Sequence, residues 1–198
     1  MQNQSNQIFR AYDVRGIYGL DLTPKTAELI GRAFGTFVGN VKTIAIGRDV
    51  RLSGKILQDS LVKGIISTGC NVTDLGLIPS PVLYFSVPHK NFDAGIMITA
   101  SHLPAQWNGF KFCDKRGIVI SEGNGLEKIK EIFLQKKFST AVGKIEVYEN
   151  ILNEYKEFVK SKIKIKKSLK IVADFGNSVT VLVVPNILVA ISLNVNNC

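Results

Sequence analysis

The sequence is poor in the residues that build disulfide frameworks and common metal sites. Its 198 residues include only three cysteines, Cys70, Cys113 and Cys198, and two histidines. An odd number of cysteines without a paired spacing argues against both a disulfide framework and a zinc site. Because free cysteines are typical of reducing compartments, we expect a cytoplasmic protein.

Signals for secretion and for membrane insertion are also weak. Residues 1–7 are polar, without the basic start and apolar core of a signal peptide, so we expect a disordered tail there. The most apolar stretch, residues 179–195, is shorter than the roughly 20 residues that cross a bilayer. It is also interrupted by Pro185, Asn186 and Ser192. We therefore expect no membrane partner.

Negative charge is scarce, since 25 lysines and arginines face 16 aspartates and glutamates, a formal net charge of +9. This balance suits a polyanionic ligand, and by itself it suits nucleic acid equally well. Six lysines follow one another closely: Lys160, Lys162, Lys164, Lys166, Lys167 and Lys170. Few aromatic residues lie between them, so we interpret them as a solvated linker and expect no nucleic-acid partner. Residues 49–55 do not form a nucleotide-binding P-loop, because Asp49 stands where its first glycine is required.

Apolar periodicity alternates between strands and helices, which predicts an α/β protein with a mixed sheet. Short apolar runs predict strands at residues 43–46, 71–75, 94–98, 109–113, 118–120 and 169–174. Helical spacing predicts helices that begin near Pro24, Gly54, Ser80, Leu126 and Ile151. Residues 12–16 are predicted to form a turn.

A polar, lysine-bearing stretch at residues 135–143 predicts a domain boundary. We expect residues 8–145 to form the first α/β domain, residues 146–168 a linker helix with the basic stretch, and residues 169–198 the truncated start of a second, similar domain. Residues 178–198 contain no charged side chain. This is typical of a buried segment separated from its domain, or of a shifted reading frame, and predicts exposed apolar surface.

A loop over residues 99–111 carries Ser101, directly after the predicted strand at residues 94–98. Ligands of open α/β sheets bind beyond the carboxyl ends of strands, so Ser101 is expected in a ligand-binding position. Pro104 and the turn-forming pair Asn108-Gly109 predict a stiff loop.

Three interpretations of Ser101 remain open from local chemistry. Acyl transfer is the weakest, because the glycine-flanked strand-to-helix turn of hydrolases is missing. A phosphoryl carrier fits better, since Lys111 and His102 can offset the charge of a phosphate. An ordinary serine on a surface turn is the simplest of the three.

Four motifs in a fixed order decide between these interpretations. Residues 9–16 read FRAYDVRG, residues 46–54 read IGRDVRLSG, residues 74–81 read DLGLIPSP, and residues 99–104 read TASHLP. With these motifs the sequence resembles the α-D-phosphohexomutase family over residues 8–177. The opening motif is most similar to the phosphomannomutase/phosphoglucomutase branch.

The resemblance implies an intramolecular phosphotransferase, which is an isomerase. Phosphorylated Ser101 would pass its phosphoryl group to a mannose or glucose 1-phosphate, giving a hexose 1,6-bisphosphate that returns its other phosphate to the serine. The resemblance further implies Lys111 as an acid, base or charge-stabilising group and His102 as a helper at the substrate hydroxyl. Arg15 is implied to orient the phosphate, with Tyr12 beside it in substrate binding.

The resemblance also implies Mg²⁺, which the family holds with an aspartate triad of its second domain and a phosphoserine oxygen. This sequence has no such triad, so only the phosphate on Ser101 would serve as a ligand. Because the family's sugar-reading and distal phosphate-binding domains are missing too, we expect the isolated chain to be inactive. Leu103 departs from the family, where asparagine is commoner. The alternative function is a non-catalytic remnant or a basic module that binds anionic partners.

Overall fold

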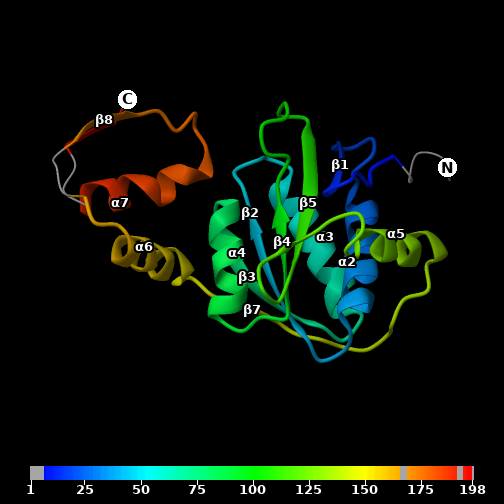
Figure 1. Ribbon diagram of the computed structural model, residues 1–198. Helices are drawn as coiled ribbons and strands as arrows, with labels where there is room; N and C mark the ends of the chain where they lie inside the picture. Colours follow the sequence, from blue (N-terminus) through cyan, green and yellow to red (C-terminus); the bar gives the residue numbers. More distant parts are fainter. Residues whose placement is uncertain (1–6, 166–168, 191–193, 198) are drawn as a thin grey trace.

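Strands β1 to β7 form one mixed sheet in the order β1-β5-β4-β2-β3-β7, with β6 paired to β5 (Figure 1). The computed structural model describes residues 7–165, 169–190 and 194–197. The strands of the sheet are β1 (Val14–Ile17), β2 (Thr43–Arg48), β3 (Asn71–Leu77), β4 (Ala94–Ile98), β5 (Trp107–Asp114), β6 (Val119–Ile120) and β7 (Ile145–Val147). β2 runs parallel to β3 and β4, whereas β5 runs antiparallel to β1, β4 and β6. The predicted α/β class with a mixed sheet is confirmed.

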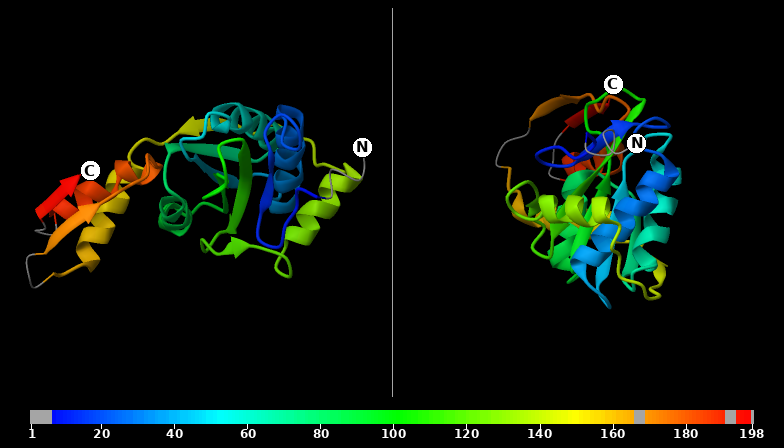
Figure 2. Two further views of the ribbon diagram at one scale, coloured as in Figure 1. Left: turned by 90° about the horizontal axis from the view of Figure 1, so that it is seen from above. Right: turned by 90° about the vertical axis from the view of Figure 1, so that its right-hand side faces the viewer.

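Helices cover both faces of this sheet (Figure 2). One face carries α2 (Pro24–Val38), α3 (Gly54–Ile66) and α5 (Leu126–Gln135), and the other carries α4 (Ser80–His89). α6 (Ile151–Lys162) lies beside α4, and α7 (Val184–Ala190) lies beside α6, to one side of the sheet (Figure 1). α2, α3 and α5 share one apolar cluster with one face of the sheet, and α4, α6 and α7 share a second cluster with the other face. The main domain is therefore a three-layer α/β/α sandwich.

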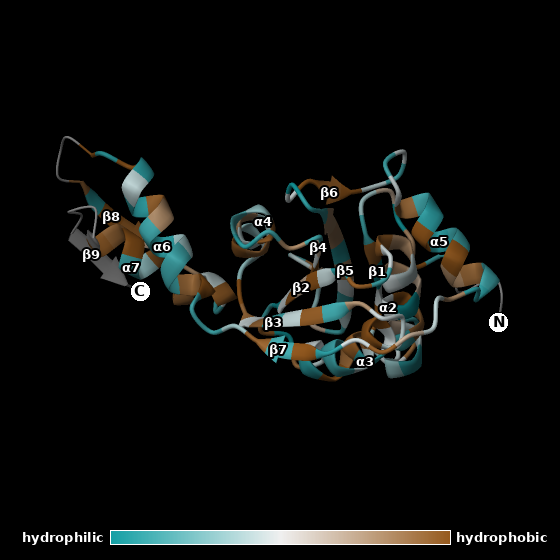
Figure 3. Ribbon diagram, turned by 90° about the horizontal axis from the view of Figure 1, so that it is seen from below, coloured by the Kyte–Doolittle hydropathy of each residue, from teal (hydrophilic) through white to brown (hydrophobic). Residues whose placement is uncertain are grey.

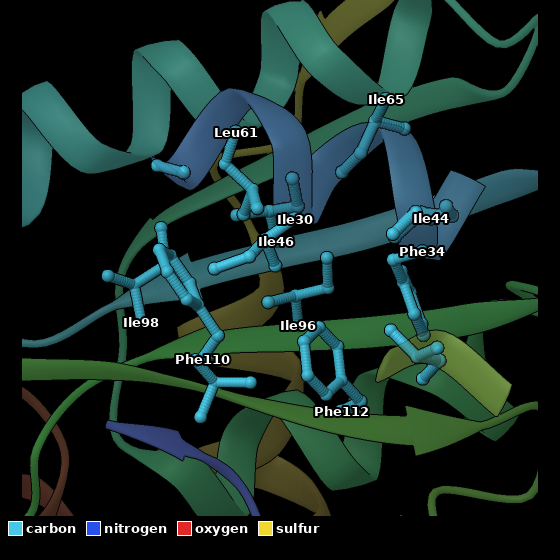
Figure 4. Close-up of a cluster of buried hydrophobic side chains, with 14 of the residues drawn as sticks. Ile30, Phe34, Ile44, Ile46, Leu61, Ile65, Ile96, Ile98, Phe110 and Phe112 are labelled. Atoms are coloured by element: carbon cyan, nitrogen blue, oxygen red, sulfur yellow. The ribbon is translucent and has the colours of Figure 1, made fainter. Parts of the chain in front are cut away.

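The larger cluster is packed from side chains of helices and strands that face one another (Figure 4). Phe34 of α2 lies against Phe112 of β5, with 4.7 Å between the ring centroids, and Leu61 and Ile96 are fully buried beside them. Hydrophobic and hydrophilic residues alternate along helices such as α5, as expected for helices with one buried face (Figure 3). Because each large side chain buried in this way contributes about 1.5–3 kcal/mol, the cluster holds the strands that carry the site.

Local sequence signals set the starts of two helices near the site. Thr23 caps α2, accepting a hydrogen bond from the Thr26 amide at 3.1 Å, and Pro24 occupies the first turn. α4 begins at Ser80, also with a proline, Pro81, in its first turn. Both helix starts are those predicted from the sequence.

Two turn predictions are wrong. Asn108 and Gly109 lie inside β5, opposite Gly16 and Arg15 of β1, and do not turn the chain. The turn predicted at residues 12–16 gives way to strand β1 from Val14 onward. In both cases, pairing with a strand distant in sequence overrides the local turn preference. The sheet also continues through β7, past the boundary expected at residue 145.

One polar cluster joins α6 to the end of α4. Glu154 accepts a hydrogen bond from the Tyr148 hydroxyl, and its carboxylate lies 3.1 Å from His89 Nε2 and 3.5 Å from Lys90 Nζ. Lys90 in turn donates to the Tyr148 hydroxyl at 2.8 Å. The hydrogen bond from Tyr148 and the charge of Lys90 lower the pKa of Glu154, and the bond to Tyr148 raises the pKa of Lys90. His89 therefore has a structural role in this cluster.

Beyond α6 the chain forms a small unit that is only partly buried. β8 (Lys170–Ala173) pairs in parallel with β9 (Asn194–Asn197), and Val183 and Ile187 are buried in the second apolar cluster. Val172, Val181 and Val189 are 66%, 51% and 65% exposed, so much of the apolar surface here faces solvent. None of the helices in the described residues is long and apolar enough to cross a membrane. The expected tail at residues 1–7 falls, apart from Gln7, outside the described residues, as do Lys166, Lys167 and Cys198.

Candidate functional site

The candidate site lies where three loops leave the carboxyl ends of parallel strands. Asp49 and Arg51 follow β2, Ser80 follows β3, and Ser101 follows β4. These residues line a cavity of about 500 Å³, whose opposite wall is the turn at residues 176–180. Small-molecule sites typically measure roughly 300–1,000 Å³, so the cavity is large enough for a phosphosugar. It occupies the edge of the sheet where ligands of α/β proteins bind.

Ser101 is exposed and has a left-handed backbone conformation, with φ of 56°. Residues with a side chain seldom adopt this conformation, and those that do are concentrated at functional sites. The Ser101 amide donates to Thr99 Oγ1 at 2.8 Å, and the Ser101 Oγ lies 3.3 Å from Nδ1 of His102. The structure thus brings Ser101 and His102 together.

The carbonyl groups of the serine loop converge on the guanidinium of Arg51. Nη1 donates to the carbonyls of Pro104 at 2.8 Å and Trp107 at 2.9 Å, and Nη2 donates to those of Ser101 at 3.0 Å and Leu103 at 2.7 Å. The remaining nitrogen, Nε, lies 3.3 Å from Asp49 Oδ2. The four N–H groups of Nη1 and Nη2 are thus matched by four carbonyl oxygens, and Nε forms an ion pair with Asp49.

Asp49 connects the loop after β2 to the serine loop. Its Oδ2 accepts a 2.6 Å hydrogen bond from Thr99 Oγ1, and its Oδ1 accepts one of 3.0 Å from the Arg51 amide. The side chains of Asp49 and Arg51 are only 14% and 12% exposed. An aspartate beside Arg51 would repel an anion, so the sequence itself favours an internal ion-pair network here over phosphate binding, and Asp49 and Arg51 form such an ion pair in the structure.

Arg15 and Tyr12 line a second pocket, of about 420 Å³, which shares Leu103 with the first. Asp13 holds the Arg15 side chain, with 2.7 Å between Oδ2 and both Nε and Nη2. Tyr12 is 72% exposed at the rim. The two pockets are therefore neighbours on either side of Leu103.

Strand register places Lys111 on the same face of the sheet as Arg15. Arg15 pairs with Gly109, two residues before Lys111, and Lys111 pairs with Met97, which lines the first pocket. A Cβ added to Gly109 would lie 3.2 Å from Arg15 Cγ, so the Arg15 side chain crosses above this glycine. Arg15 and Lys111 are therefore diagonal neighbours on one face. Among the described residues that line the two pockets, neither Lys111 nor His102 is present.

The residues present do not fit a Mg²⁺ site. Within the described parts of the chain, no group of three or more His, Cys, Asp or Glu side chains could hold a metal ion. Asp49, the carboxylate that lines the cavity, is already engaged by Arg51 and Thr99. Mg²⁺ requires several oxygen ligands in near-octahedral geometry, which one occupied carboxylate does not supply.

Thr99 is the residue of this site that sequence reasoning missed. It accepts from the Ser101 amide and donates to Asp49, so it links the serine to the loop after β2. The sequence does contain an indication of this role of Thr99, because a hydroxyl two residues before a serine can accept a hydrogen bond from that serine's amide. Residues 176–180, which form a wall of the cavity, were predicted only as part of a second unit.

The chain matches a described protein domain and many curated proteins. The domain described as phosphoglucomutase/phosphomannomutase, alpha/beta/alpha domain I, matches residues 6–140. A phosphomannomutase/phosphoglucomutase of Pseudomonas putida is 36% identical over 195 residues, covering 96% of this chain and 41% of that protein. A phosphoglucosamine/phosphogalactosamine mutase of Sulfurisphaera tokodaii is 35% identical over 188 residues, covering 90% of this chain and 41% of that protein. This chain thus spans about two-fifths of the length of both relatives.

The fold has a counterpart among solved structures. A phosphoglucomutase/phosphomannomutase family protein of Burkholderia thailandensis superposes with a TM-score of 0.87 at 33% identity, covering 98% of this chain and 44% of the other. With such coverage the similarity extends past Asn177, where the sequence is expected to depart from the family. The near-equal identities to mutases named for different sugars do not select a substrate.

Proposed function

Because the chain belongs to the phosphoglucomutase/phosphomannomutase family, we propose that it is the serine-bearing part of a phosphohexomutase. In this proposal Ser101 carries a phosphoryl group that interconverts hexose 1-phosphate and hexose 6-phosphate, of mannose or glucose, through a hexose 1,6-bisphosphate. The proposed setting is the cytoplasm, in keeping with the buried, free thiols of Cys70 and Cys113.

The observation that carries the proposal is the geometry of Ser101. Its hydroxyl is exposed, its backbone is held in the rare left-handed region, and it faces a cavity large enough for a phosphosugar. Arg15 in the adjoining pocket supplies a planar cation that suits a phosphate. Catalysis of phosphoryl transfer consists mainly of positioning and charge neutralisation, which these groups can provide.

We assign the steps of transfer as follows. The free sugar hydroxyl attacks phosphorus and forms a new P–O bond, while the bond between phosphorus and Ser101 Oγ breaks. His102 takes the proton of the attacking hydroxyl, and the departing Oγ receives a proton from Lys111. Arg15, with Tyr12 beside it, orients the phosphate and offsets its charge. Return of the sugar's other phosphoryl group to Ser101 reverses both proton movements.

Family membership brings Mg²⁺ and a hexose 1,6-bisphosphate into the proposal. The phosphate on Ser101 is the one metal ligand that we assign to this chain, and no step is derived through the metal. Because the chain spans 41% of the Pseudomonas putida relative, we propose that these 198 residues take up a phosphoryl group without completing the mutase cycle.

The test is phosphoryl uptake from glucose 1,6-bisphosphate and mannose 1,6-bisphosphate, followed by intact-protein and peptide mass spectrometry. We expect uptake of a single phosphoryl group, located on Ser101, and no sustained conversion of hexose 1-phosphate to hexose 6-phosphate. Ser101→Ala should abolish uptake. Ser161→Ala, which removes an exposed serine of α6, should leave it unchanged.

Two results would contradict the proposal. One is a wild-type chain that takes no phosphoryl group from either bisphosphate. The other is uptake that persists in Ser101→Ala, which would place the modified residue elsewhere.

A further inference from the structure

Arg51 holds the serine loop by its backbone, because each hydrogen bond that it donates to the loop ends on a carbonyl oxygen. The four carbonyls that it binds belong to Ser101, Leu103, Pro104 and Trp107, and so span the whole bend between β4 and β5. Backbone carbonyls gathered around one buried cation fix the path of the loop whatever its side chains are. The planar guanidinium suits this task, because its donors point in fixed directions.

A second contact reaches the serine from the other side. Thr99 Oγ1 accepts a hydrogen bond of 2.8 Å from the Ser101 amide and donates one of 2.6 Å to Asp49 Oδ2. Asp49 also forms an ion pair with Arg51, with 3.3 Å between Oδ2 and Nε, so hydrogen bonds and this ion pair connect the three side chains to the amide and the carbonyl of Ser101. Both ends of the strained residue are thereby fixed.

We infer that Arg51, Asp49 and Thr99 are positioning residues that hold Ser101 in its left-handed conformation with the hydroxyl exposed. The inference rests on the proposed function, in which that hydroxyl carries the phosphoryl group. Arg51 is therefore not a phosphate ligand, although it is a cation that lines the cavity. Its two terminal nitrogens are engaged by four carbonyls and its Nε faces the Asp49 carboxylate, so a phosphate that bound to Nη1 or Nη2 would displace a loop carbonyl.

Thr99 offers the sharpest test, because two substitutions separate its hydroxyl from its shape. Thr99→Val keeps the volume and removes the hydroxyl, whereas Thr99→Ser keeps the hydroxyl. Amide exchange measured by NMR on the 198-residue chain should be about tenfold faster at Ser101 in Thr99→Val, the factor expected for one lost hydrogen bond. Thr99→Ser should restore slow exchange, and amides of the buried strand β2 should be unchanged in both variants.

The same variants are then compared for phosphoryl uptake from glucose 1,6-bisphosphate. Thr99→Val and Arg51→Lys should lower the maximal rate at least tenfold while leaving the half-saturating concentration within about twofold, since positioning acts on the reacting serine. Arg116→Lys, in the exposed turn between β5 and β6, is the matched arginine control and should behave as the wild type.

The outcomes that overturn the inference are specific. Wild-type exchange at Ser101 in Thr99→Val would show that the contact does not hold the serine. A raised half-saturating concentration in Arg51→Lys, with unchanged exchange at the loop amides, would make Arg51 a phosphate ligand. If the wild type takes up no phosphoryl group, the proposed function fails, and the exchange measurements still decide whether these residues hold Ser101.

Discussion

At the scale of single residues, Gly109 shows how tightly the site is built. A Cβ at this position would lie 2.4 Å from the Val14 carbonyl oxygen and 3.0 Å from that of Thr99, both backbone atoms. We predict that Gly109→Ala lowers the free energy of unfolding by about 1–3 kcal/mol, because the strands must separate to admit the methyl group. Urea denaturation measures this change.

Gly54→Ala is the matched control for that substitution. A Cβ on Gly54, the first residue of α3, would meet Arg48 Cδ at an ordinary 3.6 Å. We expect the free energy of unfolding to stay constant or to rise by up to about 1 kcal/mol. If Gly109→Ala and Gly54→Ala lowered the free energy of unfolding equally, the close backbone contacts at Gly109 would not be the cause of the destabilisation.

The buried cysteines give a second prediction at this scale. Burial raises the pKa of the Cys113 thiol from 9.0 to about 12, and burial also raises the pKa of Cys70. Because the thiolate is the reactive form, Cys70 and Cys113 should react with a disulfide reagent at pH 8 only after unfolding. The measurement is reagent uptake in a Cys198→Ser background, with and without urea.

The raised pKa of Cys113 also makes the free energy of unfolding depend on pH. A thiol whose pKa is higher in the folded state stabilises that state fully below pH 9.0, and this contribution declines as the pH rises toward 12. The free energy of unfolding should therefore fall faster with rising pH in the wild type than in Cys113→Ala. Parallel slopes would contradict the assignment.

At the scale of elements, Glu154 is the polar contribution to the attachment of α6 to α4, which also share apolar and aromatic contacts. The hydrogen bond from Tyr148 and the charge of Lys90 lower the pKa of Glu154 below its model-compound value of 4.5. Its contribution to stability is therefore present above pH 4.5 and is lost as the pH falls below that value. We predict that Glu154→Gln lowers the free energy of unfolding by roughly 1 kcal/mol at pH 7, with the difference from wild type shrinking in acid.

Glu157→Gln on the same helix is the control for that prediction. Glu157 is 73% exposed and pairs with Lys160 on the solvent side of α6. Such surface pairs contribute little, so we expect a change of no more than about 0.5 kcal/mol in urea denaturation. A pH-independent loss in Glu154→Gln would indicate a packing defect and not a lost charge interaction.

The elements also show what local signals can predict. The strand Ala94–Ile98 and the helix starts at Pro24 and Ser80 follow from apolar patterns and capping residues, and so does the position of Ser101 beyond a strand. The pairing of Arg15 with Gly109 could not be predicted, because turn residues gave no sign of the partner strand. The contacts of Arg51 could not be predicted either, since backbone carbonyls leave no mark in the sequence.

At the scale of the whole molecule, apolar side chains remain exposed beyond α6. Val181 and Val189 are 51% and 65% exposed, and exposed apolar surface of this kind promotes association. We predict that the double variant Val181→Lys/Val189→Lys self-associates less than the wild type, with the midpoint of urea denaturation unchanged. Sedimentation velocity over a range of concentrations measures this.

The Val181→Lys/Val189→Lys variant adds positive charge as well as removing apolar surface, so a control must separate these two effects. Val41 and Val142 are 83% and 96% exposed on the first domain, so Val41→Lys/Val142→Lys adds the same charge at a different place. We expect this control to self-associate nearly as the wild type does. If self-association fell equally in both double variants, the added positive charge and not the lost apolar surface would be the cause.

Contact through the backbone also bears on how the serine loop can vary in evolution. Because Arg51 binds carbonyl oxygens, the side chains at positions 103, 105 and 106 can change without loss of the contacts that shape the loop. Leu103 is one such position, since the hydrogen bond from Arg51 ends on its carbonyl oxygen. A loop whose path is encoded elsewhere in the chain is free to diversify its surface chemistry, which makes positions 103, 105 and 106 the natural place to select new ligand preferences around an unchanged Ser101.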